Sequence, residues 1–186
     1  DPNNKGKWTL SPTCYFPMGW APCGSVLTLS ASDLIKFAKV HLNKGRTESG
    51  KSWLSPASIK QMQTSRIQLP PYADYLVTDW GLGWSLINTT QTAMVGHGGR
   101  TAGQTAYLQL VPERNLAFVI QQNTTKRAVL TDVTQEMLSA LTGITLKNAE
   151  PQKKNTDAVL LQRLTGRYTS IAVDIDVVFE GGELVT

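Results

Sequence analysis

The chain has 186 residues, 41% of them hydrophobic, and its 18 lysines and arginines against 14 aspartates and glutamates give a formal net charge of +4. A folded chain of this length buries roughly 70% of its unfolded surface, so we expect a hydrophobic core. The basic residues are scattered without interleaved aromatics and no apolar run approaches the roughly 20 residues that span a bilayer, so we expect neither a nucleic-acid partner nor a membrane segment in this chain.

The first 22 residues contain four prolines, which predicts irregular structure. Cys14 and Cys23 lie nine positions apart. This spacing is compatible with one disulfide formed outside the cytoplasm and equally with two buried thiols. It lacks the CxxC pattern of zinc sites, so we expect no metal.

The first predicted helix begins at Ser30. Asp33 follows three residues later, as in a variant of the capping box, and apolar residues then recur at helical spacing over residues 34–42 until Gly45 ends the helix. His41 belongs to this apolar pattern. The pattern therefore favours a packed or surface histidine over a catalytic one.

Downstream segments with apolar side chains on both faces of a strand predict an antiparallel sheet. In chain order, we expect a helix starting at Ser55-Pro56, a loop over 65–78, a hairpin of 80–87 with 92–95, a hairpin of 105–111 with 116–122, and a helix over 125–141. Leu108 and Leu110 lie on one face of their strand and Tyr107 on the other, so helices should cover both faces of the sheet. The last helix is expected to turn one apolar face to the core: Leu130, Val133, Met137 and Leu141.

One of the two histidines lies among glycines, in the sequence His97-Gly98-Gly99 between predicted strands. Small residues leave room for a ligand to approach the backbone, and an imidazole titrates near neutrality. On spacing alone, a β-bulge or a turn explains the glycines equally well.

The following residues extend this pattern, with Thr101, Gly103, Tyr107, Pro112-Glu113-Arg114 and Asn123. The whole resembles the third motif region of penicillin-recognising serine hydrolases, in the branch with class C-like β-lactamases, D-alanyl-D-alanine carboxypeptidases, D-aminopeptidases and related esterases. Residues 23–34, 53–56 and 75–84 resemble further segments of that branch. The resemblance covers residues 22–141 and implies an α+β fold, with an antiparallel sheet flanked by helices, and acyl transfer without a metal or organic cofactor.

The resemblance also implies roles for individual residues. His97 takes a catalytic position usually held by lysine, and Gly98 and Gly99 belong to the substrate-binding strand. The backbone N–H of Arg100 corresponds to an oxyanion-hole donor, and Asn123 to an asparagine that binds a substrate carboxylate in some relatives, with a turn-forming Asn as the open alternative. An imidazole is mostly neutral at pH 7, unlike lysine, which weighs against efficient β-lactamase activity and leaves esterase, D-peptidase or carboxypeptidase chemistry open.

The other family motifs are missing or misplaced. No serine has a lysine three residues later, which the family's nucleophile requires. Tyr168-Thr169-Ser170 matches the Tyr-x-Asn/Ser motif formally but follows the third motif, so we interpret it as chance. We therefore interpret the chain as the C-terminal part of a larger serine acyl hydrolase that acts on an ester, amide or D-peptide, and we expect it to be inactive alone. A non-catalytic binding or regulatory module that retains the fold is the alternative.

The expected organisation is a hydrolase portion over residues 1–145, a polar linker over 146–158 and the beginning of an appended β-rich domain over 159–186. Alternation over 172–179 and the turn residues 180–183 predict two strands in that domain, with exposed edges. The expected partners are a small-molecule or peptide substrate and the N-terminal part of the same protein. The resemblance favours a bacterial protein that is periplasmic or secreted.

Overall fold

The structure is a computed structural model that describes residues 19, 24, 26–69, 77–101, 103–124, 126–146, 157–169 and 174–185. The chain forms two compact units, Asp1–Ala149 and Glu150–Thr186. Cys14, Cys23 and most of the expected linker lie outside the described residues. Within the described residues, every helix is too short or too polar to cross a lipid bilayer.

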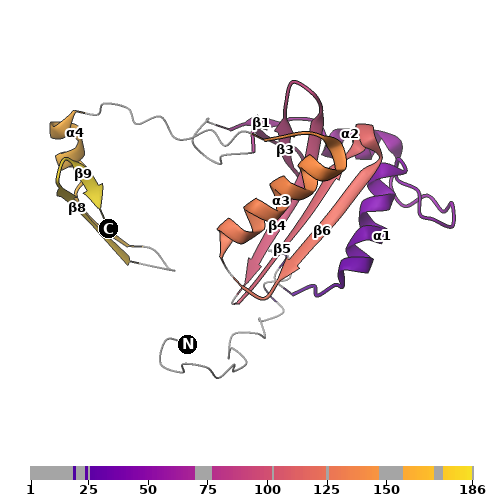
Figure 1. The fold of residues 1–186 in the computed structure, drawn as a ribbon, viewed down its shortest axis with the longest axis horizontal. Coiled ribbons are helices and arrows are strands. Elements are labelled where there is room, and N and C mark those ends of the chain that lie inside the picture. Colours follow the sequence, from indigo (N-terminus) through magenta and orange to yellow (C-terminus); the bar gives the residue numbers. More distant parts are fainter. Residues whose placement is uncertain are drawn as a thin grey trace. The chain divides into compact units, whose positions relative to one another are not determined.

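A six-stranded antiparallel sheet organises the first unit, with its strands side by side in chain order (Figure 1). The strands are β1 (Ile67–Gln68), β2 (Asp79–Trp80), β3 (Ser85–Asn88), β4 (Ala93–Thr101), β5 (Gln104–Val111) and β6 (Leu116–Gln122). The predicted hairpin of 105–111 with 116–122 is confirmed. The predicted hairpin of 80–87 with 92–95 is correct in part: residues 85–88 pair with 93–96, but Trp80 belongs to β2, which folds back onto β3, and β4 continues to Thr101. Pro112–Arg114 forms a 3-10 turn between β5 and β6, and Asn115 closes it with a φ of 48°, a conformation that asparagine tolerates better than most residues.

The prediction of a loop over residues 65–78 is wrong in part. Ile67 and Gln68 form β1, which pairs with Trp80 and Asp79 of β2. Two residues without an apolar alternation carry no strand signal of their own, so only their pairing partner makes them a strand.

Helices cover both faces of the sheet, as predicted (Figure 1). They are α1 (Ala31–Leu42), α2 (Pro56–Met62) and α3 (Arg127–Thr142). Ala38 of α1 packs with Trp84, Leu86, Val95, Leu108 and Leu110. On the other face, Leu138 of α3 packs with Ile87, Met94, Val111 and Phe118. The strands therefore contribute apolar side chains to two parts of the core, one on each face of the sheet.

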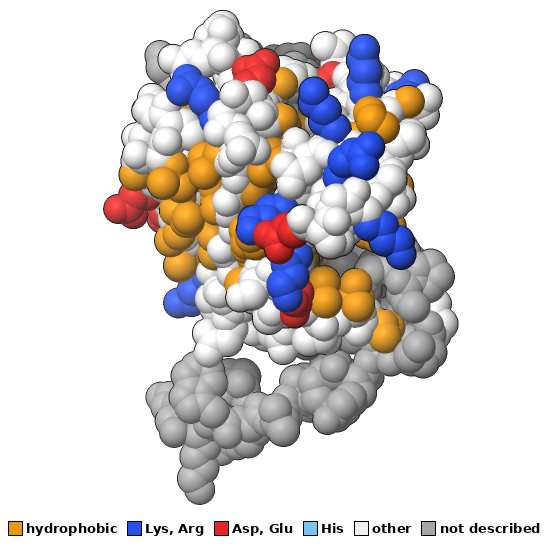
Figure 2. All heavy atoms as spheres, turned by 90° about the vertical axis from the view of Figure 1, so that its right-hand side faces the viewer, with side chains coloured by type: hydrophobic (Ala, Val, Ile, Leu, Met, Phe, Trp, Pro, Cys, Tyr) orange, Lys and Arg blue, Asp and Glu red, His pale blue; other side chains and the backbone are white. Residues whose placement is uncertain are grey.

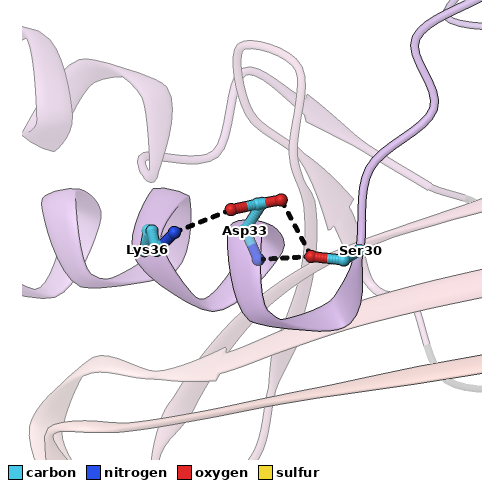
Figure 3. Close-up of polar contacts among 3 residues, drawn as sticks. All are labelled: Ser30, Asp33 and Lys36. Carbon is cyan, nitrogen blue, oxygen red and sulfur yellow. Dashed lines mark hydrogen bonds and ion pairs between the residues drawn. The ribbon is translucent and has the colours of Figure 1, made fainter.

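The start of α1 confirms the predicted cap (Figure 3). The Ser30 hydroxyl accepts a hydrogen bond from the Asp33 backbone N–H at 3.2 Å and donates to the Asp33 carboxylate at 2.8 Å. The Lys36 ammonium donates to the other carboxylate oxygen at 2.8 Å. The hydrogen bond from Lys36, followed by that from Ser30, lowers the pKa of Asp33. The carboxylate therefore stays charged beside the positive end of the helix dipole.

His41 packs inside the unit, in agreement with its place in the apolar pattern. It is 3% exposed and contacts Phe37 and Trp84 edge-on, with ring centroids 4.8 and 5.0 Å away. Neither of its ring nitrogens has a hydrogen-bond partner among the described residues, and burial lowers the pKa of His41. A neutral, core-packed histidine is the structural role of this residue.

The buried face of α3 differs from the predicted one. Thr134 and Leu138 are buried, whereas Val133 and Leu141 are 36% and 53% exposed. Apolar residues cover a wide arc of this helix, so their spacing alone does not determine which face of α3 packs against the sheet. Hydrophobic side chains also gather in the left half of the face that Figure 2 shows.

Within residues 157–169 and 174–185, the second unit contains one helix and a three-stranded antiparallel sheet in the order β7-β8-β9. Its elements are α4 (Ala158–Arg163), β7 (Gly166–Thr169), β8 (Asp174–Glu180) and β9 (Glu183–Val185). The two-residue turn at Gly181 and Gly182 has φ values of 60° and 90°, as in a type I′ hairpin. The described part of this unit thus holds three strands where we expected two. None of its described residues is buried.

Candidate active site

One edge of β4 is open beyond residue 96. β3 pairs with residues 93–96 of β4, whereas β5 pairs with residues 95–101. Residues 97–101 therefore have a strand neighbour on one side only within the part of the chain that the structure describes. The backbone N–H and C=O groups on the free side are available to a ligand or to further polypeptide.

This edge borders a cavity of about 360 Å³, and four of the five predicted site residues line it: His97, Gly98, Gly99 and Arg100. Trp80 and Ser85 contribute from β2 and β3, and Thr105 and Tyr107 from β5. The first half of α3 closes the remaining side with Leu130, Thr131 and Thr134. Asn123 is exposed just beyond the end of β6 and is not part of this lining.

The His97 side chain is exposed and lies beside Trp80. The two ring centroids are 5.6 Å apart, with an interplanar angle of 68°, as in an edge-to-face contact. Trp80 thus limits the positions of the imidazole from one side. Sequence reasoning placed Trp80 in a family-like segment but did not connect it to His97.

The glycines of β4 make room for Tyr107. A Cβ atom at Gly96 would lie 2.9 Å from both the Tyr107 hydroxyl and the Leu108 carbonyl oxygen, and one at Gly98 would lie 3.3 Å from the Tyr107 ring. The Tyr107 hydroxyl donates to the Gln109 side-chain oxygen at 2.8 Å, and the buried Gln109 amide donates to the Val95 carbonyl at 2.9 Å. These contacts tie β5 to β4 next to His97. At Gly99, by contrast, a Cβ atom would meet nothing within 4 Å, so this residue leaves open space.

A buried carboxylate holds β2 in place. Asp79 is 7% exposed and accepts hydrogen bonds from the Ser65 hydroxyl at 2.6 Å and from the Asn88 amide at 2.7 Å. These bonds, that of Ser65 first, lower the pKa of Asp79 against the opposing effect of burial. Asp79 therefore fixes the strand that carries Trp80 to the cavity.

Asp79→Asn is expected to destabilise the chain by about 1.5–3 kcal/mol at pH 7, because charge-assisted hydrogen bonds are lost and an amide meets the Asn88 amide. Since the folded state lowers the pKa of Asp79, its contribution is complete above the ordinary value of 3.8 and is lost as the pH falls through the lowered one. Urea unfolding at several pH values measures both effects. Asp132→Asn, at an exposed carboxylate of α3, is the control. The same acid dependence in Asp79→Asn and in the unmodified chain would contradict this role.

No three His, Cys, Asp or Glu side chains among the described residues gather closely enough to hold a metal ion.

An antiparallel sheet between helices, with a glycine-rich strand bordering a cavity, is the architecture expected from the resemblance. The Beta-lactamase family model matches residues 2–141, and the chain belongs to this family. Penicillin-binding protein 4 of Amycolatopsis lactamdurans is 27% identical over 169 residues, which cover 90% of this chain and 43% of that protein.

Solved structures agree on the fold. The crystal structure of SurE superposes with a TM-score of 0.61 at 24% identity, covering 83% of this chain and 35% of SurE, and the structure of SurE with D-Leu gives a TM-score of 0.59 at 23% identity, covering 83% of this chain and 36% of that one. The octameric penicillin-binding protein homologue from Pyrococcus abyssi gives a TM-score of 0.50 at 23% identity, covering 82% and 33%. The chain thus spans less than half the length of each of these relatives.

Proposed function

We propose that this chain forms one wall of the reaction cleft in a serine acyl hydrolase, which hydrolyses an ester, an amide or a D-peptide through an acyl-enzyme. The nucleophilic serine would lie in a part of the longer family members to which these 186 residues do not correspond. The observation that carries this proposal is the open edge of β4, where residues 97–100 line the cavity.

In this proposal, His97 transfers protons between the serine, the substrate and the leaving group. Its imidazole is exposed at the border of the cavity, and histidine is the side chain that most often serves as a general acid or base. Gly98 and Gly99 give the substrate access to the backbone, and the Arg100 N–H is an oxyanion-hole donor. The position of Asn123 outside the cavity lining favours its turn-forming alternative.

The relatives support the substrate range and the location of the proposed enzyme. SurE has been solved with D-Leu, so a protein of this fold accommodates a D-amino acid. Penicillin-binding protein 4 is a bacterial relative. We place the enzyme in the periplasm or outside the cell, acting on a small molecule or peptide by side-chain chemistry without a metal or organic cofactor.

Labelling with a fluorescent penicillin and with a fluorescent fluorophosphonate tests this proposal. We expect the 186 residues to remain unlabelled, because they contain no Ser-x-x-Lys motif. A longer polypeptide that supplies this motif upstream should be acylated stoichiometrically, and should lose the label when that serine is replaced with alanine. A label on a serine of the 186-residue chain would overturn the position of the nucleophile. No label on the longer polypeptide with either probe would favour the non-catalytic module.

A further inference from the structure

Few contacts restrain the imidazole of His97. Its segment of β4 has a strand neighbour on one side only, where His97 lies opposite Leu108. The side chain is exposed, and no hydrogen bond or ion pair joins its ring nitrogens to another described residue. The edge-on contact with Trp80 is the one ring contact that His97 makes in the part of the chain that the structure describes. Because an exposed histidine samples several rotamers, a neighbour that restrains its ring changes how often it points in one direction.

The backbone of Trp80 is held on both sides. Trp80 pairs with Ile67 of β1 and with Ser85 of β3. Its carbonyl accepts a hydrogen bond from the Arg66 N–H at 2.8 Å. The preceding residue is the buried Asp79, whose two hydrogen bonds fix β2. The indole therefore extends from a fixed point of the sheet.

Small residues leave the indole room to reach the imidazole. Trp80, Ser85 and Gly96 lie opposite one another on β2, β3 and β4, so they form one row across the sheet and share a face. The short Ser85 side chain donates a hydrogen bond to the Gly96 carbonyl at 2.6 Å, and Gly96 has no side chain. Neither residue blocks the indole from the imidazole that follows Gly96 in the chain. The Ser85 hydrogen bond also fixes the peptide group between Gly96 and His97.

We propose that Trp80 is a positioning residue, whose indole holds the His97 imidazole in the orientation in which it transfers protons at the cavity. This inference rests on the proposed function. An edge-to-face contact sets both the distance and the direction of the second ring, and the half-buried indole has a fixed backbone behind it. Proton transfer requires hydrogen-bond reach, so an imidazole that turns freely spends part of its time in unproductive rotamers. Trp80 thus acts through His97 and not on the substrate.

Substitutions of Trp80 in the longer polypeptide, with p-nitrophenyl acetate as substrate, test this proposal. Trp80→Leu should lower kcat about tenfold and keep KM within about twofold, because the proton-transfer group is misplaced while the substrate site is kept. Trp80→Phe restores an aromatic edge and should bring kcat to within about threefold of the original value. In the His97→Ala background, Trp80→Leu should cause no further loss, since the indole acts only through the imidazole.

Trp53→Leu is the matched control. Trp53 also makes an edge-on ring contact, with Phe37 at 5.9 Å between centroids, and it is not part of the cavity lining. This variant should hydrolyse the ester at the original rate. An unchanged kcat in Trp80→Leu overturns the proposal, and so does an equal loss from Trp80→Leu with and without His97. A Trp80→Phe variant as slow as Trp80→Leu overturns the ring contact as the cause.

NMR of the 186-residue chain tests the contact separately from catalysis. In the unmodified chain, the ring current of Trp80 should displace the His97 ring protons, and the couplings about the His97 Cα–Cβ bond should report one rotamer. Both signals should average in Trp80→Leu. Averaged couplings in the unmodified chain overturn the positioning role whether or not Trp80→Leu folds. If the longer polypeptide hydrolyses no ester, the proposed function fails and the catalytic role of Trp80 fails with it, while the couplings still show whether Trp80 restrains the imidazole.

Discussion

Replacing His97 with alanine in the longer polypeptide proposed above is expected to lower kcat/KM for p-nitrophenyl acetate by about 10²–10⁴-fold. The imidazole is exposed at the border of the cavity, and histidine is the side chain that most often transfers protons in catalysis, so the variant would lack the proposed proton-transfer group. Steady-state kinetics with this activated ester measures the loss.

The fold should tolerate this change, because the exposed ring contributes an edge-on contact with Trp80 and little burial. The unfolding free energy of His97→Ala should therefore stay within about 1 kcal/mol of the unmodified protein. Lys60→Ala, at an exposed position of α2, serves as the kinetic control and should hydrolyse the ester at the original rate. Undiminished turnover by His97→Ala would remove this residue from the mechanism.

The largest loss of stability is expected from Gly45→Ala, at about 2–5 kcal/mol. Gly45 has a φ of 92°, and a Cβ atom there would lie 2.0 Å from the Leu54 carbonyl oxygen. The Gly45 N–H donates to the Val40 carbonyl at 2.7 Å, and its own carbonyl accepts from the Trp53 and Leu54 N–H groups at 2.9 and 3.1 Å. The backbone can therefore make room only by giving up these bonds, in addition to the cost of the left-handed conformation.

Gly50→Ala separates the cost of the steric contact with Leu54 from the cost of the left-handed backbone conformation. Gly50 has a φ of 81°, but nothing lies within 4 Å of a Cβ atom built there. Alanine at this position should cost only the left-handed conformation, about 1–2 kcal/mol. The midpoint of urea unfolding at an unchanged slope measures both variants. An equal loss in the two would show that the contact with Leu54 is not limiting.

Local signals predicted most of the elements correctly. The β5–β6 hairpin follows from two apolar runs around Pro112 and Asn115, because those turn residues favour the backbone conformations that a reversal needs. The start of α1 follows from Ser30 and Asp33, since a capping contact involves residues only three positions apart. In both cases the determining atoms are close together in the sequence.

The features that were missed depend on contacts between residues far apart in the sequence. Asp79 was not singled out as a structural residue, because its partners Ser65 and Asn88 lie on other segments of the chain. The predicted buried face of α3 was partly wrong because Val133 and Leu138 are both apolar. Only the position of the sheet decides that Leu138 is buried and Val133 is exposed. The family-like pattern around His97, in contrast, was readable because its residues are contiguous.

Taken alone, the amino-acid order determined the family, an antiparallel sheet with apolar side chains on both faces, and the glycine-rich motif around His97, because periodicity, turn residues and motifs act over short distances. The tertiary structure decided which of these residues share a cavity. β3 stops opposite Gly96 while β5 continues to Thr101, and this difference in strand length leaves one edge of β4 open. The tertiary structure also brings Trp80, Arg100 and the beginning of α3 together around the cavity and leaves Asn123 outside its lining. Contacts between such distant segments depend on how the sheet and helices pack.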